Sequence, residues 1–248
     1  MRASFFLLCV VVLSTAQTSR EPGVPAGRMS GMGHSGPDWV AALWQDSHFQ
    51  KIFENPSVIV WQLKLNPGES TLLDRYGHDF LEVVIQSGSM SMADEHGQLT
   101  PLSLPGAQLM RGGFAKALKN TDKGRPFQAV FVEFRVALGA ERRGPEAQVL
   151  CPSGGDFGGT LRHHALGIVE TDQVCARRFL MSARAPSPAL VIAIRPARVI
   201  ASSASGSSQL LKAGQAAWLT SGEPSVQAPA ASAVDFVGIE FKEIQQSK

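Results

Sequence analysis

Short apolar runs separated by turn-forming residues extend over most of the chain. Val, Ile and Leu recur in stretches such as residues 58–65, 81–85 and 190–194, with Gly, Pro and Ser between them. Runs of this length bounded by turn residues are typical of β-strands, and a series of them favours a closed antiparallel sandwich or barrel. Between Asp38 and Asn55 the apolar spacing is compatible with a short helix that leads into an extended segment. The pattern therefore predicts an all-β fold with a short N-terminal helix.

The chain contains an internal repeat. The segment Leu81–Met90 reads like Leu190–Val199, 109 positions later; Leu104-Pro-Gly-Ala-Gln has a counterpart in Lys212-Ala-Gly-Gln-Ala, 108 positions on; and Val132-Glu-Phe-Arg matches Ile239-Glu-Phe-Lys at an offset of 107. Three blocks in the same order at nearly one offset indicate a tandem duplication. We expect a first barrel at 38–140 and a second, degenerate barrel at 167–248, joined by a Gly-rich, charged linker at 141–166.

The N-terminus has the features of a secretory signal peptide. Arg2 is followed by an apolar run from Phe5 to Leu13 and then by the small residues 14–16. This run is shorter than the roughly 20 residues that a membrane span needs. A buried N-terminal strand is the alternative. Cleavage after residue 16 would leave an exported protein, periplasmic or extracellular, with no membrane span and with a polar, flexible leader at 17–37.

The cysteine positions suggest a disulfide bond, and the charge balance excludes one class of partner. Cys9 lies in the signal segment, so Cys151 and Cys175 remain and can form one disulfide in an oxidising compartment. Two free, buried thiols are the alternative. With 23 basic and 21 acidic residues the net charge is only +2, which argues against a nucleic-acid partner. The chain carries no Gly-x-Ser-x-Gly, P-loop, Cys-x-x-Cys or His-Glu-x-x-His motif.

The motif order of the first half resembles the cupin superfamily. Asn66-Pro-Gly-Glu-Ser is followed by Asp74-Arg-Tyr-Gly-His-Asp-Phe-Leu-Glu-Val-Val-Ile-Gln-Ser-Gly, then by Leu104-Pro-Gly-Ala and Arg111-Gly-Gly-Phe-Ala-Lys-Ala-Leu-Lys-Asn. In cupins a first motif carries a His-x-His pair and an acidic residue between glycines, and a second carries a Gly- or Pro-rich turn, another His and an Asn. With the repeat, the chain resembles a bicupin, which implies two tandem jelly-roll barrels.

The resemblance also implies a divalent metal, held by imidazoles that converge inside a barrel. At the His-x-His positions, however, this chain has Asp74 and Tyr76, and at the third His position it has Lys116, whereas Gly113 and Asn120 match the pattern. A lysine ammonium repels a divalent ion unless its pKa is strongly lowered. The second half has a shortened loop and no His after its first strand. We therefore expect no metal cofactor.

Two arrangements of the remaining polar residues are open. Asp74, His78 and Glu82 recur every four residues and would share one face of an uninterrupted strand, where they could bind Fe, Mn, Ni, Cu or Zn. The family register instead turns Leu81 and Val83 inward and Glu82 outward.

A metal-free pocket is the second arrangement. The resemblance places Tyr76, His78, Arg111 and Lys116 at the mouth of the first barrel, where they could receive a carboxylate or a sugar acid. A simpler version of this site is a salt bridge between Lys116 and Asp74 that replaces the metal.

The leading hypothesis is an exported bicupin-like protein that acts as a non-catalytic, small-molecule-binding or structural module, with a small molecule or a carbohydrate as ligand. The alternative is a metal-dependent cupin enzyme, of the dioxygenase or isomerase type, with a rearranged site in the first barrel. The two halves are expected to pack as an intramolecular pseudo-dimer.

Overall fold

The computed structural model describes residues 41–94, 96–104, 106–140, 165–179, 183–184, 188–200, 208–219, 225–227 and 234–242. The expected signal peptide and leader, most of the expected linker, and Cys151 lie outside the described residues. Within them, every regular element except one 3-10 turn is a β-strand, which confirms the all-β class.

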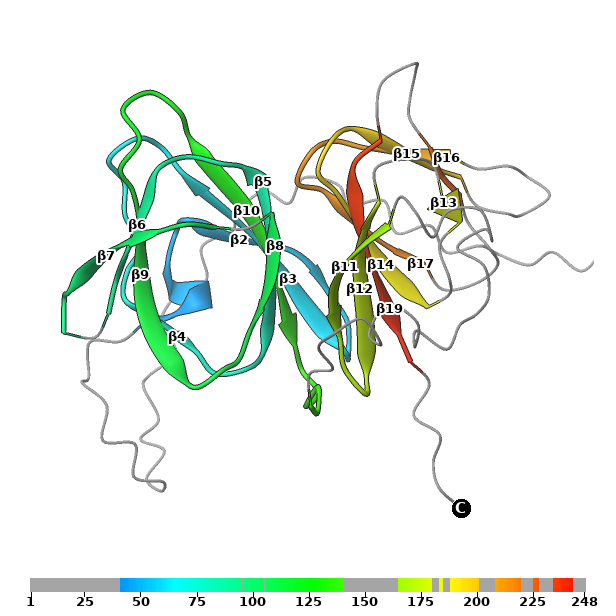
Figure 1. The fold of residues 1–248 in the computed structure, drawn as a ribbon, viewed down its shortest axis with the longest axis horizontal. Helices are drawn as coiled ribbons and strands as arrows, with labels where there is room; N and C mark the ends of the chain where they lie inside the picture. Colours follow the sequence, from blue (N-terminus) through cyan, green and yellow to red (C-terminus); the bar gives the residue numbers. More distant parts are fainter. Residues whose placement is uncertain are drawn as a thin grey trace, which may run out of the picture. The chain divides into compact units, whose positions relative to one another are not determined.

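The first half forms two five-stranded sheets (Figure 1). One has the order β1 (Ala41–Ala42), β4 (Asp74–Tyr76), β9 (Phe114–Asn120), β6 (Met90–Ala93), β7 (Leu99–Leu102), and the other has the order β2 (Phe49–Glu54), β3 (Val58–Leu65), β10 (Phe127–Phe134), β5 (Phe80–Gln86), β8 (Ala107–Met110). All pairings are antiparallel except the short parallel bridge between β1 and β4.

The second half repeats this strand order. One sheet runs β11 (Ala165–Glu170), β12 (Val174–Phe179), β19 (Phe236–Phe241), β14 (Ala189–Ala193), β17 (Ala216–Leu219), and the other runs β13 (Ala183–Arg184), β18 (Ser225–Gln227), β15 (Ala197–Ile200), β16 (Ser208–Leu211). The duplication read from the sequence is therefore also a duplication of topology, and the two tandem jelly-roll barrels are confirmed.

The short helix expected between Asp38 and Asn55 is wrong. The described part of that segment contains β1, the 3-10 turn η1 (Leu43–Gln45) and β2. Leu43 and Phe49 are buried while Trp44 is exposed. The 3-10 turn η1 interrupts the segment, and pairing of β2 with β3 satisfies the backbone of the residues that follow it.

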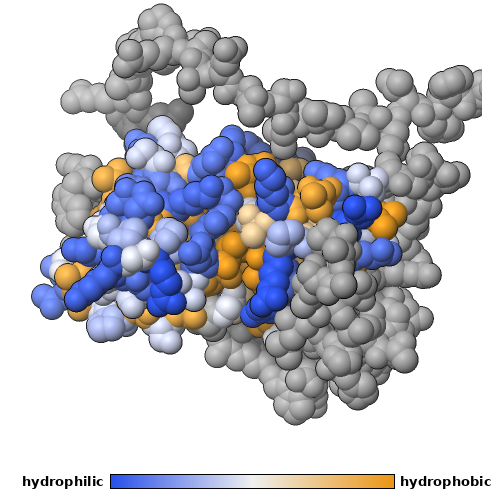
Figure 2. Space-filling view, turned by 90° about the horizontal axis from the view of Figure 1, so that it is seen from above, coloured by the Kyte–Doolittle hydropathy of each residue, from blue (hydrophilic) through white to orange (hydrophobic). Residues whose placement is uncertain are grey.

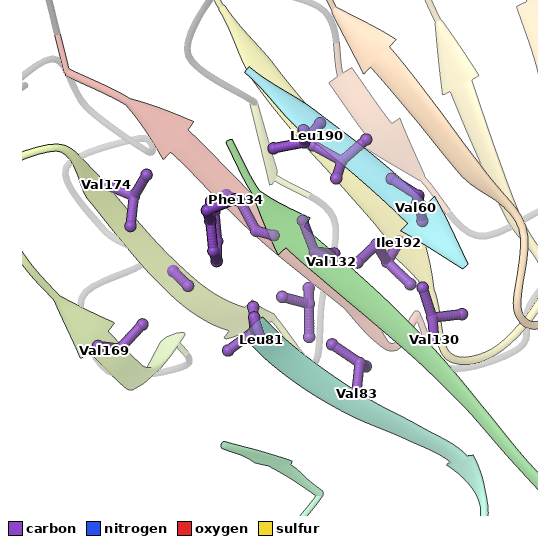
Figure 3. Packing of buried hydrophobic residues seen from close by; sticks show 14 of the residues in the cluster. Val60, Leu81, Val83, Val130, Val132, Phe134, Val169, Val174, Leu190 and Ile192 are labelled. Carbon is purple, nitrogen blue, oxygen red and sulfur yellow. The ribbon is translucent and has the colours of Figure 1, made fainter. Parts of the chain in front are cut away.

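Two apolar clusters explain why the central strands of the first half are buried on both faces. Alternate residues of β3, β5 and β10 point into the first barrel, where they meet Tyr76 and Leu118 from the opposite sheet. The residues between them point outward, and they share one cluster with residues of the second half (Figure 3). That shared cluster contains Val60, Leu81, Val83, Val130, Val132 and Phe134 from the first half, and Val169, Val174, Leu190 and Ile192 from the second.

Further contacts join the two halves at this apolar cluster. Phe53 stacks on Trp218 with ring centroids 6.0 Å apart, and Gln62 Nε2 donates a buried hydrogen bond of 3.1 Å to the carbonyl oxygen of Gly214. A Cβ added at Gly214 would collide with the side-chain amides of Gln62 and Gln128. The close approach of this turn, with its φ of +78°, therefore requires glycine.

The face in Figure 2 is largely hydrophilic, with hydrophobic residues interspersed. Large exposed apolar side chains among the described residues are Trp44, Leu72, Leu99, Val136 and Leu210. Single exposed apolar residues are normal on a protein surface. The described part of the chain has no helix with the length and apolar character that a membrane crossing requires.

Candidate functional site

Four polar residues converge inside the first barrel. Asp74 and Tyr76 lie on β4, Glu82 lies on β5, and Lys116 lies on β9 directly opposite Asp74. Asp74, Tyr76 and Glu82 have no exposed surface, and Lys116 is 3% exposed. The alternation of β4 and β9 aims these side chains inward, alongside Leu118 and Asn120. The barrel interior therefore carries a polar cluster beside the apolar side chains that fill the rest of it.

The expectation that Glu82 faces solvent is wrong. Leu81 and Val83 pack in the cluster that both halves share, so Glu82 points the other way, into the first barrel. Its Oε2 accepts a hydrogen bond of 3.0 Å from Gln108 Nε2, which lies opposite on β8. Because both faces of β5 are buried, the hydrophobic pattern does not reveal which face lines the barrel.

Lys116 is held by soft and aromatic groups. Its Nζ lies 3.2 Å from the Met110 sulfur, 5.2 Å from the centroid of the Tyr76 ring and 5.7 Å from that of Phe114. Burial lowers the pKa of Lys116, whereas the charge of Glu82 opposes that change. Cation–π contacts with desolvated rings favour the charged form. The ammonium and the Glu82 carboxylate thus compensate each other's charge within the barrel.

The expected salt bridge between Asp74 and Lys116 is not formed. Neither carboxylate oxygen of Asp74 has a hydrogen-bond partner among the described residues. Burial, together with the nearby Asp46 carboxylate, raises the pKa of Asp74 to about 8. Asp74 is therefore neutral at pH 7, and a neutral Asp74 can donate a hydrogen bond to Asp46, which two ionised carboxylates cannot do.

Two further oxygen atoms of this cluster have no partner within the described structure, the hydroxyl of Tyr76 and Oε1 of Glu82. The Tyr76 ring packs edge-to-face on Phe80 and stacks on Phe114. Burial and the charges of Asp74 and Glu82 raise the pKa of Tyr76 well above its usual value, so the hydroxyl remains a donor. Buried polar groups are nearly always hydrogen-bonded in proteins. The unpartnered oxygens of Tyr76 and Glu82 in one barrel indicate a place for a polar ligand.

His78 lies apart from this cluster. Its side chain is 56% exposed, and its Nδ1 lies 2.6 Å from Oε1 of Glu133. The other oxygen of Glu133 accepts a 2.9 Å hydrogen bond from Trp61 Nε1. The structure thus places Asp74 and Glu82 inside the barrel and His78 at its surface. Glu133 was missed by sequence reasoning, although a lone Glu in the apolar run 129–134 was a usable signal.

Arg111 also stays outside the interior cluster. Its guanidinium donates to Asp79 Oδ2 at 2.7 Å and to the Gly139 carbonyl oxygen at 2.9 Å. Asp79 also accepts from the Gly112 backbone at 3.0 Å. These bonds fix the loop between β8 and β9. Of the five expected pocket residues, the interior cluster contains Asp74, Tyr76 and Lys116.

The second half has polar residues of its own that the sequence reasoning overlooked. Lys242 Nζ donates to Oε1 of Glu170 at 2.9 Å and to the Thr171 carbonyl oxygen at 2.6 Å. At the position that corresponds to Glu82, 109 residues later, stands Val191, which packs in an apolar cluster with Phe179. The described second barrel therefore lacks a counterpart of Glu82.

Cys175 is disulfide-bonded. It lies on β12 and is nearly fully buried. Cys151, the partner expected from the sequence, is outside the described residues, so the pairing of these two cysteines stays a prediction.

Comparisons with known proteins agree with this architecture. No family model matches the chain, and no curated protein matches it in sequence. Among solved structures, AerE from Microcystis aeruginosa is similar with a TM-score of 0.50 and 11% identity, over 80% of this chain and 99% of that one. A cupin 2 conserved barrel domain protein from Leptotrichia buccalis has a TM-score of 0.45 and 12% identity, over 78% and 88% of the two chains.

The similarity to AerE over nearly all of that chain supports the fold of two tandem jelly-roll barrels described above. A further similar structure is salicylate 1,2-dioxygenase from Pseudoaminobacter salicylatoxidans in adducts with gentisate, with a TM-score of 0.47 and 14% identity, over 74% of this chain and 68% of that one. At such identities the likeness concerns the fold alone. The fold by itself does not assign a function.

The interior residues do not fit the metal that a cupin fold suggests. The described residues contain no group of three or more His, Cys, Asp or Glu side chains placed to hold a metal ion. Of the alternative set, Asp74 and Glu82 face the interior while His78 binds Glu133 at the surface. The ammonium of Lys116 lies among the inward side chains and would repel a divalent cation. We derive no step through a metal.

Proposed function

We propose that this chain is an exported, non-catalytic cupin-fold protein that binds a small polar molecule inside its first barrel. Two buried oxygen atoms without partners in the described structure, the Tyr76 hydroxyl and Oε1 of Glu82, carry this proposal. An unpartnered buried polar group costs about 1–3 kcal/mol. A ligand that supplies the missing hydrogen bonds would recover this cost.

The chemistry of the cluster indicates the kind of ligand. Tyr76 and the ammonium of Lys116 donate, whereas Glu82 accepts. Opposite charges on Lys116 and Glu82 leave the site close to neutral. The rings of Tyr76, Phe80 and Phe114 supply apolar walls. A neutral molecule with several hydroxyl groups, such as a carbohydrate, matches this mixture better than an ion does.

Native mass spectrometry of the mature protein tests the proposal. A panel of neutral monosaccharides, sugar acids and short carboxylates is added in turn, and metal content is measured after loading with Fe, Mn, Ni, Cu and Zn. We expect a sugar adduct that Glu82→Gln and Tyr76→Phe weaken at least tenfold. The matched control, Lys119→Met, alters an exposed residue of the same strand as Lys116 and should leave binding unchanged.

Near-stoichiometric metal that is lost in His78→Ala would overturn the proposal and favour a metal-dependent cupin enzyme. If the folded protein bound no compound in the panel, the ligand-binding proposal would be wrong, and a purely structural role would remain. Export is tested separately by N-terminal sequencing of the secreted protein, which should begin near Gln17.

A further inference from the structure

The proposed site is closed on every side by the chain, so a ligand can enter only if a segment moves. Asp74, Tyr76 and Glu82 have no exposed surface in the closed structure. Residues 41–48, which comprise β1, η1 and the turn before β2, lie against β4 beside the site (Figure 1). We call this segment the strap. The inference that follows rests on the proposed function for its purpose, but its test needs no ligand.

The strap is attached to the barrel by few contacts. β1 pairs with β4 at only two positions, Ala41 with Asp74 and Ala42 with Arg75, whereas β3 and β10 pair along eight. Leu43 packs in the barrel cluster, but the adjacent Trp44 is 71% exposed. Local opening begins where backbone pairing is short and few apolar groups are buried. The strap meets both conditions.

Asp46 fastens the strap to the barrel. Its side chain is 1% exposed, and Oδ1 lies 2.8 Å from both the backbone nitrogen and the Nδ1 of His48. Its Oδ2 accepts a 2.7 Å hydrogen bond from the backbone of Leu72, which belongs to the barrel. The same carboxylate lies beside Asp74, two positions after Leu72. The strap and the barrel therefore meet at two buried carboxyl groups.

We propose that the strap is a pH-dependent cover of the first-barrel site, and that its closure requires one proton between the carboxyl groups of Asp46 and Asp74. Two adjacent buried carboxyl groups cannot both ionise without strong repulsion. With a proton present, Asp74 donates to Asp46 and the strap stays closed. Without this proton both carboxyl groups are ionised, and their repulsion displaces the strap, because it is the most weakly attached segment.

The other charged groups around Asp74 do not cancel this repulsion. Tyr76 on β4 stays neutral, and the charge of Glu82 on β5 is compensated by Lys116. Lys116, opposite Asp74 on β9, directs its ammonium to Met110 and Tyr76. On the strap, His48 contacts Asp46. In the barrel, a hydrogen bond from Thr71, just before β4, favours the ionised form of Asp74. Negative charge prevails around Asp74.

Amide hydrogen exchange followed by mass spectrometry tests this inference on the full chain. Exchange of a peptide covering the strap is measured from pH 5 to pH 9 and corrected for the intrinsic chemical rate. Because opening gives Asp74 its ordinary pKa, the opening constant should rise about tenfold per pH unit below pH 8 and level off above it. In Asp74→Asn the corrected opening constant should not depend on pH.

Arg75→Gln is the matched control, because it alters the exposed neighbour of Asp74 and should keep the wild-type slope. Equal slopes in wild type and Asp74→Asn would overturn the inference. So would opening of β10 amides at the same rate as strap amides, which would mean global unfolding instead of strap release. Failure of sugar binding would contradict the proposed function and leave this result unaffected.

Discussion

Asp74 and Lys116 face each other across β4 and β9, but the ammonium of Lys116 turns away from Asp74, toward the Met110 sulfur and the Tyr76 ring. The acid that balances Lys116 is Glu82 on the other sheet. Asp74 is left beside a second acid, Asp46, on the strap. The first barrel thus contains two distinct pairs. Lys116 and Glu82 balance each other's charge, whereas Asp46 and Asp74 share a proton.

The balanced pair predicts a specific coupling between two mutations. Lys116→Met leaves Glu82 as an uncompensated buried carboxylate and should lower the free energy of unfolding by roughly 3 kcal/mol. Lys116→Met combined with Glu82→Gln should recover at least half of that loss, because no unpaired charge remains. Urea unfolding of the two single variants and the double variant gives the coupling energy. Lys119→Met, on the exposed face of β9, should change stability little, and additive effects of the two interior mutations would contradict the pairing.

The shared proton predicts how stability depends on pH. The pKa of Asp74 is raised in the folded protein, so its contribution is complete below the unfolded value near 4 and is lost as pH rises toward 8. Asp74→Asn removes this loss. The free energy of unfolding of wild type relative to Asp74→Asn should fall by about 1.4 kcal/mol per unit between pH 5 and pH 7. Urea titrations at each pH measure it, and a constant difference would show that Asp74 titrates normally.

The fold was predictable because its signals are repeated and local. Apolar runs bounded by turns predicted strands, and blocks at nearly one offset predicted two equivalent barrels, which the matching strand orders bear out. The direction of Glu82 was not predictable, because Leu81 and Glu82 are both buried, one in the cluster shared with the second half and one inside the barrel. Alternation identifies a buried face only when the other face meets water.

The partners of the site residues were the least accessible to sequence reasoning. Asp46, on the strap, lies beside Asp74, but the sequence of the strap has no periodic pattern that would place it there. Glu133 contacts His78, which is 55 positions away in the sequence. Lys242 and Glu170, 72 positions apart, pair in the second half in the same way. Motif resemblance placed Asp74, Tyr76 and Lys116 in the first barrel, because a motif records positions along the chain. It could not show which charges compensate each other in space.

The interface between the halves predicts different costs for two glycine substitutions. Gly68 and Gly214 both have positive φ, but only Gly214 has neighbouring side chains in the way of a Cβ. Gly68→Ala should cost about 1 kcal/mol from backbone strain alone. Gly214→Ala should cost about 1–3 kcal/mol more, because Gln62 must move and lose its buried bond to the Gly214 carbonyl. Equal costs in urea unfolding would mean that the Gln62 contact contributes nothing.

The apolar cluster that both halves share also predicts that the first barrel does not fold stably without the second. A fragment covering residues 38–140 would expose the outward side chains of β3, β5 and β10, among them Val60, Val83 and Val132. We expect it to aggregate or to bind a hydrophobic dye strongly without a cooperative melt. The full chain is the control. A monomeric fragment with a sharp thermal transition would show that the halves are independent.

The placement of the interior residues predicts that a metal site can be restored. Asp74, Tyr76 and Lys116 occupy inward positions of β4 and β9, with Asp74 directly opposite Lys116. Replacing all three with histidine brings three imidazoles together and removes the ammonium, which meets the ligand number of a catalytic zinc site. Calorimetry with nickel or zinc should show one site per chain, whereas Arg75→His combined with Lys119→His, on exposed positions of the same two strands, should bind at least a hundredfold more weakly. A folded triple variant without metal affinity would mean that these positions do not correspond to the cupin ligand positions.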